Sequence, residues 1–324
     1  MLTSQKILNY IKKNSNASGK ELVEFLGVIS SRAVRKQLKN LLEKGLLSKS
    51  GRPPVVYYSL ADKKTLFKLF GIDKKILHVI ENRYLFISPF GEAKYGWDGF
   101  RLWCEKTKQD PIKTATEYVK TLKKFDRFRK GNFISGMEKM RHTFDKVFLD
   151  KLFYLDFYSI ERFGKTKLGQ MLLYAKQSQD KILIYKIVEE IRQRIELVIR
   201  KYEVDGVLFI PPTVKRETQF MKELENGLNL SIKTLAVSKL KTEIIIPQKT
   251  LNKLEDRIEN AKRTIIVNDT STYKNILLID DAVGSGSTLN ETAKQIKRKG
   301  ICKGRIIGLS ITGSFKGFDV ISEV

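Results

Sequence analysis

The stretch Asn275–Leu289, NILLIDDAVGSGSTL, decides the fold of the larger part of this chain. Its four consecutive apolar residues, Ile276–Ile279, predict a central strand that is buried on both faces of a parallel sheet. Two adjacent carboxylates follow, Asp280 and Asp281, and a loop of small residues then leads into a helix. Ligands of such sheets bind beyond the carboxyl ends of the strands, where helix N-termini attract anions. The stretch therefore predicts an anion site.

The residue types in this loop indicate which anion would bind there. The two glycines allow a tight turn with inward-pointing N–H groups, and Ser285, Ser287 and Thr288 add hydroxyl donors. A carboxylate next to such a cradle can accept hydrogen bonds from the vicinal hydroxyls of a sugar. The loop is not a Walker loop, because it has no Gly-Lys-Ser/Thr and the acids precede it. We expect a phosphorylated sugar as the ligand.

The surrounding sequence alternates between helical and strand patterns. Residues 180–202 show the apolar spacing of a long amphipathic helix, and residues 218–230 and 289–300 predict two further helices. Apolar runs at residues 204–212, 231–240 and 304–312 predict strands. Alternation of this kind is typical of an α/β domain with a central parallel sheet and right-handed crossovers. We assign residues 161–324 to this domain.

The segment ILLIDDAVGSGST resembles the phosphoribosyl-pyrophosphate-binding motif of the type I phosphoribosyltransferases. The resemblance implies a phosphoribosyltransferase fold in which Asp280 and Asp281 hold the ribose hydroxyls. It also implies Mg²⁺ as a cofactor bound together with the diphosphate. The residues that it assigns to the 5′-phosphate are Val283, Gly284, Ser285, Gly286, Ser287 and Thr288.

Weaker similarities extend over roughly residues 160–313 to the ComF branch of that family. VLFIPPTVKRETQF resembles its first strand and pyrophosphate loop, and QKTLNKLEDRIENAKRTIIV resembles the segment before the motif strand. Arg257 and Asn260 of the latter segment would then be flexible-loop contacts. The pyrophosphate loop would contain Pro211, Pro212, Thr213, Lys215 and Arg216. The zinc-binding cysteine cluster that usually begins ComF proteins is absent here.

Residues 1–60 predict three short helices followed by a hairpin. The third helix has one apolar stripe with a basic and polar face beside it, as a helix that enters the major groove requires. The pattern resembles a winged helix-turn-helix domain, and its net charge is +8, from 11 Lys and Arg against 3 Asp and Glu. Use of the domain for protein contacts is the alternative. The expected DNA-binding residues are Ser31, Arg32, Arg35, Lys36, Lys39 and Asn40 on the helix, and Lys49 and Arg52 on the wing.

Residues 61–160 separate the two regions and are rich in aromatic residues and cations. Exposed aromatics between cations could stack on nucleic-acid bases. We favour instead a mainly helical linker subdomain with an aromatic core. The residues expected in this core are Trp97, Phe100, Trp103, Tyr118 and Phe125.

The composition favours a polyanionic partner. The formal net charge is +25, which favours nucleic acid first and an anionic membrane second. The two cysteines, far apart, support neither a zinc site nor a disulfide framework, and no apolar run approaches the roughly 18 residues that span a bilayer. We expect a multidomain cytoplasmic protein without a membrane partner.

Two functions fit these features, and a third stays open. A winged helix ahead of a phosphoribosyltransferase domain is similar to the architecture of the Gram-positive purine repressor. This architecture implies a homodimeric regulator of double-stranded DNA, with phosphoribosyl pyrophosphate or a nucleotide as effector. An active phosphoribosyltransferase with a DNA-binding appendage is the alternative, and a DNA-uptake or DNA-processing role is the third possibility.

Overall fold

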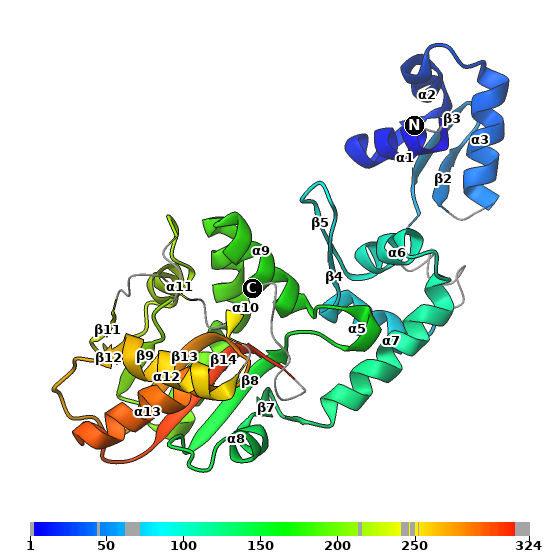
Figure 1. The fold of residues 1–324 in the computed structure, drawn as a ribbon. Coiled ribbons are helices and arrows are strands. Elements are labelled where there is room, and N and C mark those ends of the chain that lie inside the picture. The colour runs from blue at the N-terminus through cyan, green and yellow to red at the C-terminus, as the bar shows by residue number, and fades with distance from the viewer. Residues whose placement is uncertain are drawn as a thin grey trace. The chain divides into compact units, whose positions relative to one another are not determined.

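The computed structural model describes residues 3–43, 46–61, 72–212, 216–240, 246, 250–251 and 253–314 (Figure 1). The chain forms two compact units. The first contains residues 1–79 together with 110–116, and the second contains residues 80–109 together with 117–324. Each unit has its own hydrophobic core. The multidomain organisation expected from the sequence is therefore present.

The first unit begins with three helices and a three-stranded sheet of order β1-β3-β2. Ser18 starts the second helix through a capping box with Glu21, and Gly27 ends it at a φ of 57°. Ser30 caps the third helix by accepting a hydrogen bond from the Ala33 amide. The elements are α1 (Thr3–Asn14), β1 (Asn16–Ser18), α2 (Gly19–Leu26), α3 (Ser31–Glu43), β2 (Leu47–Arg52) and β3 (Val55–Leu60). This is the order of a winged helix-turn-helix, as expected.

Helices dominate the chain between this region and the first long strand of the large sheet. They are α5 (Lys74–Arg83), α6 (Gly96–Lys106), α7 (Pro111–Asp126) and α8 (Met137–Thr143). Short hairpins interrupt them, formed by β4 (Leu85–Ile87) with β5 (Ala93–Tyr95) and by β6 (Arg129–Lys130) with β7 (Phe133–Ser135). The aromatic core is confirmed, because Trp97, Phe100, Tyr118 and Phe125 are buried and Trp103 is half-buried beside Phe100.

The remaining elements build an α/β layer structure. The helices are α9 (Lys167–Ser178), α10 (Lys181–Tyr202), α11 (Phe220–Leu228), α12 (Leu254–Thr264) and α13 (Ser287–Lys299), with a short 3-10 turn at Glu161–Phe163. The strands are β8 (Lys151–Phe157), β9 (Gly206–Phe209), β10 (Lys233–Thr234), β11 (Val237–Lys239), β12 (Ile265–Val267), β13 (Ile276–Val283) and β14 (Ile306–Gly313).

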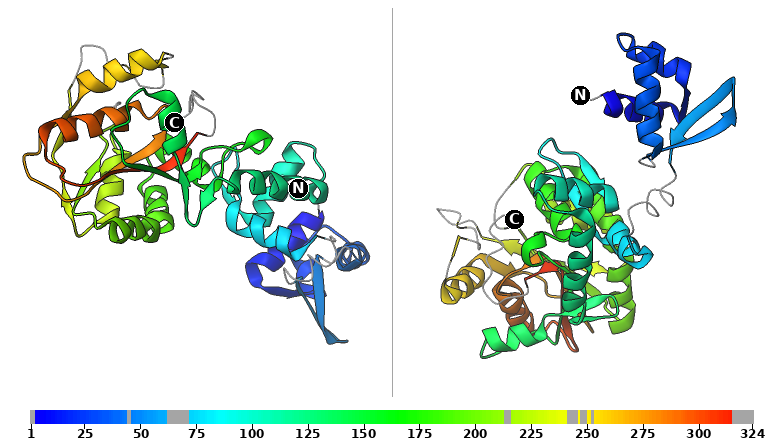
Figure 2. Two further views of the ribbon diagram at one scale, coloured as in Figure 1. Left: turned by 90° about the horizontal axis from the view of Figure 1, so that it is seen from below. Right: turned by 90° about the vertical axis from the view of Figure 1, so that its right-hand side faces the viewer.

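The large sheet has seven strands in the order β10-β9-β13-β14-β8-β7-β6. The five strands from β10 to β8 are parallel, and β7 and β6 extend the sheet as an antiparallel hairpin. Leu277 and Ile279 face α9, α10 and α11, in one continuous core cluster. Helices α12 and α13 cover the opposite face, as the yellow and orange helices show in Figures 1 and 2. The central strand is thus buried on both faces, as its composition predicts.

The sheet differs from the expectation in two places. It takes β6, β7 and β8 from residues 129–157, which we expected to lie in a separate linker subdomain. Strand β8 pairs with β14, and this pairing joins segments about 150 residues apart that local pattern does not reveal. The prediction of a single strand at residues 231–240 is also wrong. It is divided between β10 in the large sheet and β11, which pairs with β12 in a separate two-stranded sheet.

Candidate functional site

The two adjacent acids lie at the carboxyl end of the central strand. Strand β13 continues through both carboxylates to Val283, because Asp280 is still paired with Ser310 and Val283 with Gly313 of β14. The strand ends there, where the Ser314 amide donates to the Val283 carbonyl at 3.1 Å. The acids therefore sit within the last paired residues of β13, where the backbone pairs with β14 and the pairing with β9 has ended at Ile279.

Two lysines from other elements lie near these acids. Lys176 of α9 forms an ion pair with Asp281 at 2.6 Å, and both side chains are about four-fifths buried. Lys239 of β11 interacts electrostatically with Asp280. Burial lowers the pKa of Lys239 to about 8, although Asp280 partly opposes this shift. Each carboxylate is thus close to a cation from a different segment.

The pKa of Asp280 is raised to about 7. Burial is the largest cause, and repulsion by the neighbouring Asp281 carboxylate adds to it. A hydrogen bond from the Asp281 backbone amide and the charges of Lys176 and Lys239 act in the opposite direction. One of the two acids therefore changes its charge near neutral pH. A ligand that donates hydroxyl hydrogen bonds would favour its charged form.

The small-residue loop connects β13 to α13 by a sharp turn. Gly286 has a φ of +87°, and a Cβ atom there would lie 2.5 Å from the Met140 sulfur. The Ser285 and Ser287 hydroxyls are buried and lie 2.8 Å apart. Helix α13 begins at Ser287 rather than at Leu289, so that Ser287 and Thr288 form its first turn. The hydroxyl-bearing residues are thus part of the helix N-terminus, where the backbone dipoles favour an anion.

Neighbouring elements hold this turn in place. The Asn290 side chain accepts a hydrogen bond from the Phe148 amide at 2.8 Å and donates to the Lys146 carbonyl at 3.0 Å. Arg257 of α12 is buried and donates through Nε to the Leu251 carbonyl at 2.7 Å. Its Nη1 lies 3.7 Å from the position of a Cβ on Gly284. The structure therefore brings Arg257 to the predicted phosphate loop, whereas Asn260 lies one turn farther along α12.

The segment predicted as a pyrophosphate loop follows β9 at the same edge of the sheet. Strand β9 pairs with β13, and the Ile210 amide donates to the Ile279 carbonyl at 2.9 Å. The segment therefore starts, at Pro211 and Pro212, beside the two acids. Arg216 is held near α11 by a hydrogen bond that the Gln219 side chain donates through Nε2 to the Arg216 carbonyl. Thr213 and Lys215 lie outside the described residues.

The first unit carries the second candidate site. Helix α3 buries Val34, Leu38 and Leu41 and thereby turns its other face to solvent. Most of the predicted DNA-binding residues are exposed on that face: Ser31, Arg32, Arg35, Lys36 and Lys39, with Asn40 half-buried beside them. Lys39 also forms an exposed ion pair with Glu43.

The wing is the hairpin of β2 and β3. Strand β2 continues to Arg52, so Lys49 and Arg52 lie within its paired part, opposite Tyr58 and Val55. Both cations are exposed.

Sequence reasoning missed Lys176 and Lys239. Only the packing of α9 against the sheet, which brings Lys176 to Asp281, distinguishes Lys176 from the many other lysines. Lys239 was expected within a strand of the large sheet and instead reaches Asp280 from a separate hairpin. No pattern of spacing along the chain marks either residue.

Comparison with known proteins bears on the first unit. No curated protein shows a significant match to the chain. None of the helices in the described part of the chain combines the length and apolar character that crossing a membrane requires. Residues 2–48 match the family described as winged helix-turn-helix DNA-binding. Together with the order of α1 to β3, this match shows that the chain begins with a winged helix-turn-helix DNA-binding domain.

Proposed function

We propose that the protein is a DNA-binding regulator whose second unit binds phosphoribosyl pyrophosphate or a related nucleotide as effector. The observation that carries the proposal is the arrangement of Asp280, Asp281 and the Gly284–Thr288 turn at the carboxyl end of β13. The carboxylates can accept hydrogen bonds from ribose hydroxyls. They directly precede a helix N-terminus that can bind a phosphate. The same chain carries a DNA-binding domain.

The charges around the carboxylates fit a phosphorylated ligand. Lys176 and Lys239 lie near Asp281 and Asp280, and Arg257 lies near Gly284 of the turn that would bind the phosphate. A ligand with both hydroxyls and phosphates would engage the carboxylates and the cations at once. An uncharged sugar would leave the cations and the helix N-terminus without a partner from the ligand.

Mg²⁺ fits this proposal as a companion of the diphosphate. Among the described residues, no group of three or more His, Cys, Asp or Glu is placed to hold a metal ion. Mg²⁺ commonly binds through substrate phosphates, waters and one or two carboxylates. When bound with the diphosphate it would neutralise part of the phosphate charge, while Asp280 and Asp281 orient the ribose.

A thermal-shift titration with phosphoribosyl pyrophosphate and Mg²⁺ tests ligand binding, because a ligand that binds the folded state raises its melting temperature. We expect a concentration-dependent rise for the wild-type chain and its loss in Asp280→Asn/Asp281→Asn. The variant Asp256→Asn changes an exposed carboxylate of α12 and serves as the control. Equal shifts in all three proteins would refute binding at these acids.

Pentosyl transfer is the second candidate function, and the position of Pro211 and Pro212 beside the acids favours it. The same cradle that holds an effector could position a substrate, since such catalysis consists of positioning and charge stabilisation. Incubation with phosphoribosyl pyrophosphate, Mg²⁺ and a panel of bases distinguishes the two. A sensor releases no pyrophosphate, whereas turnover that disappears in Asp280→Asn/Asp281→Asn would establish the enzyme.

Genomic footprinting distinguishes a regulator from a DNA-processing protein. We expect a few discrete sites, each with two half-sites if the protein acts as a homodimer. Diffuse occupancy of DNA would favour the uptake or processing role. Sedimentation of the purified chain with and without operator DNA would then measure whether a dimer forms.

A further inference from the structure

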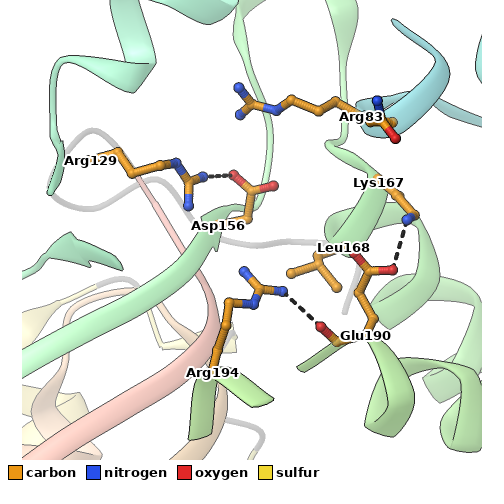
Figure 3. A pocket seen from close by; sticks show the side chains of 8 residues that line it. Arg83, Arg129, Asp156, Lys167, Leu168, Glu190 and Arg194 are labelled. Atoms are coloured by element: carbon orange, nitrogen blue, oxygen red, sulfur yellow. Dashed lines mark hydrogen bonds and ion pairs between the residues drawn. The ribbon is translucent and has the colours of Figure 1, made fainter. Parts of the chain in front are cut away.

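A pocket in the second unit lies outside the proposed effector site. Its volume is about 280 Å³, slightly below the roughly 300–1,000 Å³ of typical small-molecule sites. Side chains from α5, β6, β8, α9 and α10 line it (Figure 3). The charged groups in this lining are Arg83, Arg129, Lys167, Arg194, Asp156 and Glu190. The pocket is therefore small and strongly polar.

Cations outnumber carboxylates in this pocket. Four cationic side chains and two carboxylates line it, which leaves two net positive charges. Asp126 pairs with Arg83 at 2.6 Å and lowers this excess to one when it is included. Figure 3 shows Arg83, Arg129 and Arg194 around Asp156, and each of the three comes from a different element. An anion bound there would balance the remaining charge.

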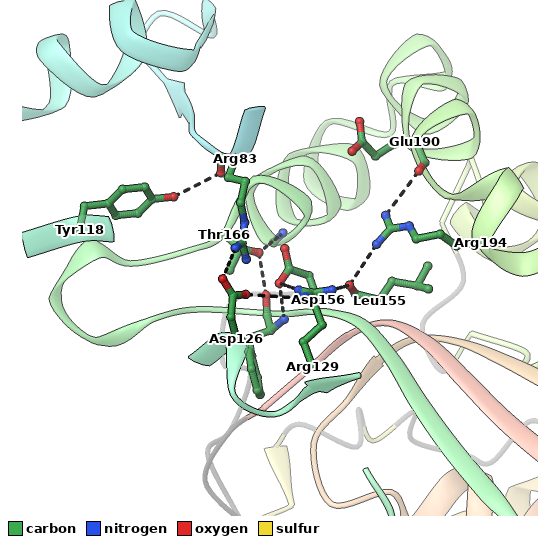
Figure 4. A network of polar contacts seen from close by, with 11 residues as sticks. Arg83, Tyr118, Asp126, Arg129, Leu155, Asp156, Thr166, Glu190 and Arg194 are labelled. Carbon is green, nitrogen blue, oxygen red and sulfur yellow. Dashed lines mark hydrogen bonds and ion pairs between the residues drawn. The ribbon is translucent and has the colours of Figure 1, made fainter. Parts of the chain in front are cut away.

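Hydrogen bonds to the backbone hold two of the three guanidinium groups, those of Arg129 and Arg194, and the Asp126 carboxylate holds that of Arg83 (Figure 4). Arg129 donates to the Leu155 carbonyl at 3.0 Å and pairs with Asp156 at 2.8 Å. Arg194 donates to the same carbonyl at 3.0 Å and to the Glu190 carbonyl at 3.4 Å. Arg129 keeps only 20% of its side chain exposed. Guanidinium groups held in this way can donate paired hydrogen bonds to the oxygens of a planar carboxylate or a tetrahedral phosphate.

Burial disfavours the charged forms of Asp156 and Arg194 in the pocket. It raises the pKa of Asp156 in spite of Arg129 and Arg83, and it lowers the pKa of Arg194 in spite of Asp156 and Glu190. The cost of burying these groups is therefore not fully offset by their mutual attraction. An added oxyanion would contact the cations and stabilise their charged forms.

The pocket lies at the carboxyl edge of the parallel sheet but is separate from the effector site. Asp156 of β8 is paired with Thr312 of β14, which in turn is paired with Ala282 of β13. Two strand spacings therefore separate Asp156 from the acidic strand, or ~10 Å at about 4.8 Å per spacing. Helix α9 connects the regions, because Lys167 in its first turn lines the pocket and Lys176 near its end pairs with Asp281.

We infer that this pocket is a second anion site, which takes the oxyanion group of a small molecule. The volume suits a phosphate or carboxylate group with a few further atoms rather than a whole nucleotide. Lys167 and the three arginines would contact the oxyanion, and Asp156 would orient Arg129. This inference does not depend on the proposed effector, since it uses none of the residues between Asp280 and Thr288.

Isothermal titration of the full chain tests the inference, with inorganic phosphate and malonate as separate probes of the phosphate and carboxylate forms. We expect Arg194→Gln to weaken binding of the preferred anion by at least about tenfold, as loss of a charge-assisted hydrogen bond implies. Arg298→Gln makes the same charge change on the exposed end of α13 and should bind like the wild type. Lys167→Gln, a milder change, should weaken binding in the same direction if Arg194→Gln does not fold.

A change in the other site separates the two anion sites. Thr288→Asp places a negative charge at the first turn of α13, where a phosphate bound at the effector site would lie. Anion binding that persists in Thr288→Asp and is lost in Arg194→Gln supports the second site. Binding that is lost in Thr288→Asp and unchanged in Arg194→Gln would overturn it, as would failure of the wild type to bind either anion.

Discussion

At the scale of single residues, Asp280 should make the second unit sensitive to pH. Its pKa is about 7 in the folded chain, above the ordinary value of 3.8, so the folded state disfavours the charged form. The free energy of unfolding should therefore fall as the pH rises from about 4 through 7. Asp280→Asn removes the carboxylate and with it this decrease in the free energy of unfolding. We therefore expect the variant to be more stable than the wild type by on the order of 2 kcal/mol at pH 8, but not at pH 4.

Tryptophan fluorescence during urea unfolding measures this effect. Both tryptophans of the chain, Trp97 and Trp103, belong to the second unit, so the signal reports the unit that contains Asp280. Asp256→Asn serves as the control because its carboxylate is exposed on α12. The explanation fails if both variants show the same difference from the wild type at pH 4 and pH 8.

Gly286 should be the least replaceable residue of the turn. Its φ of +87° is unfavourable for any residue with a Cβ, and that Cβ would lie only 2.5 Å from the Met140 sulfur. Gly300 at the other end of α13 has a φ of +67° but open space around it. We expect Gly300→Ala to cost about 1 kcal/mol from the backbone alone, and Gly286→Ala to cost clearly more. Equal urea midpoints for the two variants would contradict the contact with Met140.

At the scale of elements, α3 should be the part of the first unit that contacts DNA. Replacing Arg35 and Lys36 by Ala removes two exposed cations from its outer face, and we expect a large loss of DNA affinity with a shallower salt dependence. Lys12→Ala/Lys13→Ala removes the same charge from α1. Fluorescence anisotropy with duplex DNA compares them, and a greater loss in the α1 variant would identify another DNA-contacting helix.

Elements with strong local signals could be predicted from the sequence, and pairings between distant segments could not. Helix α10 follows from its apolar spacing and strand β13 from its run of four apolar residues, because each pattern matches the burial of that element in the fold. The acids of β13 were found for the same reason. Strand β8, by contrast, owes its place to β14, and the pocket around Asp156 needs five elements that approach only in three dimensions. Local patterns cannot encode such contacts.

At the scale of the whole molecule, effector binding and DNA binding should be coupled. A regulator requires that occupancy of the cradle changes the DNA affinity of the amino-terminal domain, typically by about 1–3 kcal/mol, or roughly 5- to 150-fold. We expect this change when anisotropy titrations with operator DNA are repeated in the presence of phosphoribosyl pyrophosphate and Mg²⁺. Thr288→Asp should keep the DNA affinity of the unliganded chain and lose the response.

Linkage supplies the decisive control for this coupling. If the ligand changes DNA affinity by a given factor, then DNA must change ligand affinity by the same factor. Calorimetric titration of the ligand into the free protein and into the protein–DNA complex measures the second factor independently. A response to ligand in the first experiment without the matching change in the second would mean that the ligand acts on the DNA or on its counterions. Matching factors that vanish together in Thr288→Asp would place the coupling in this chain.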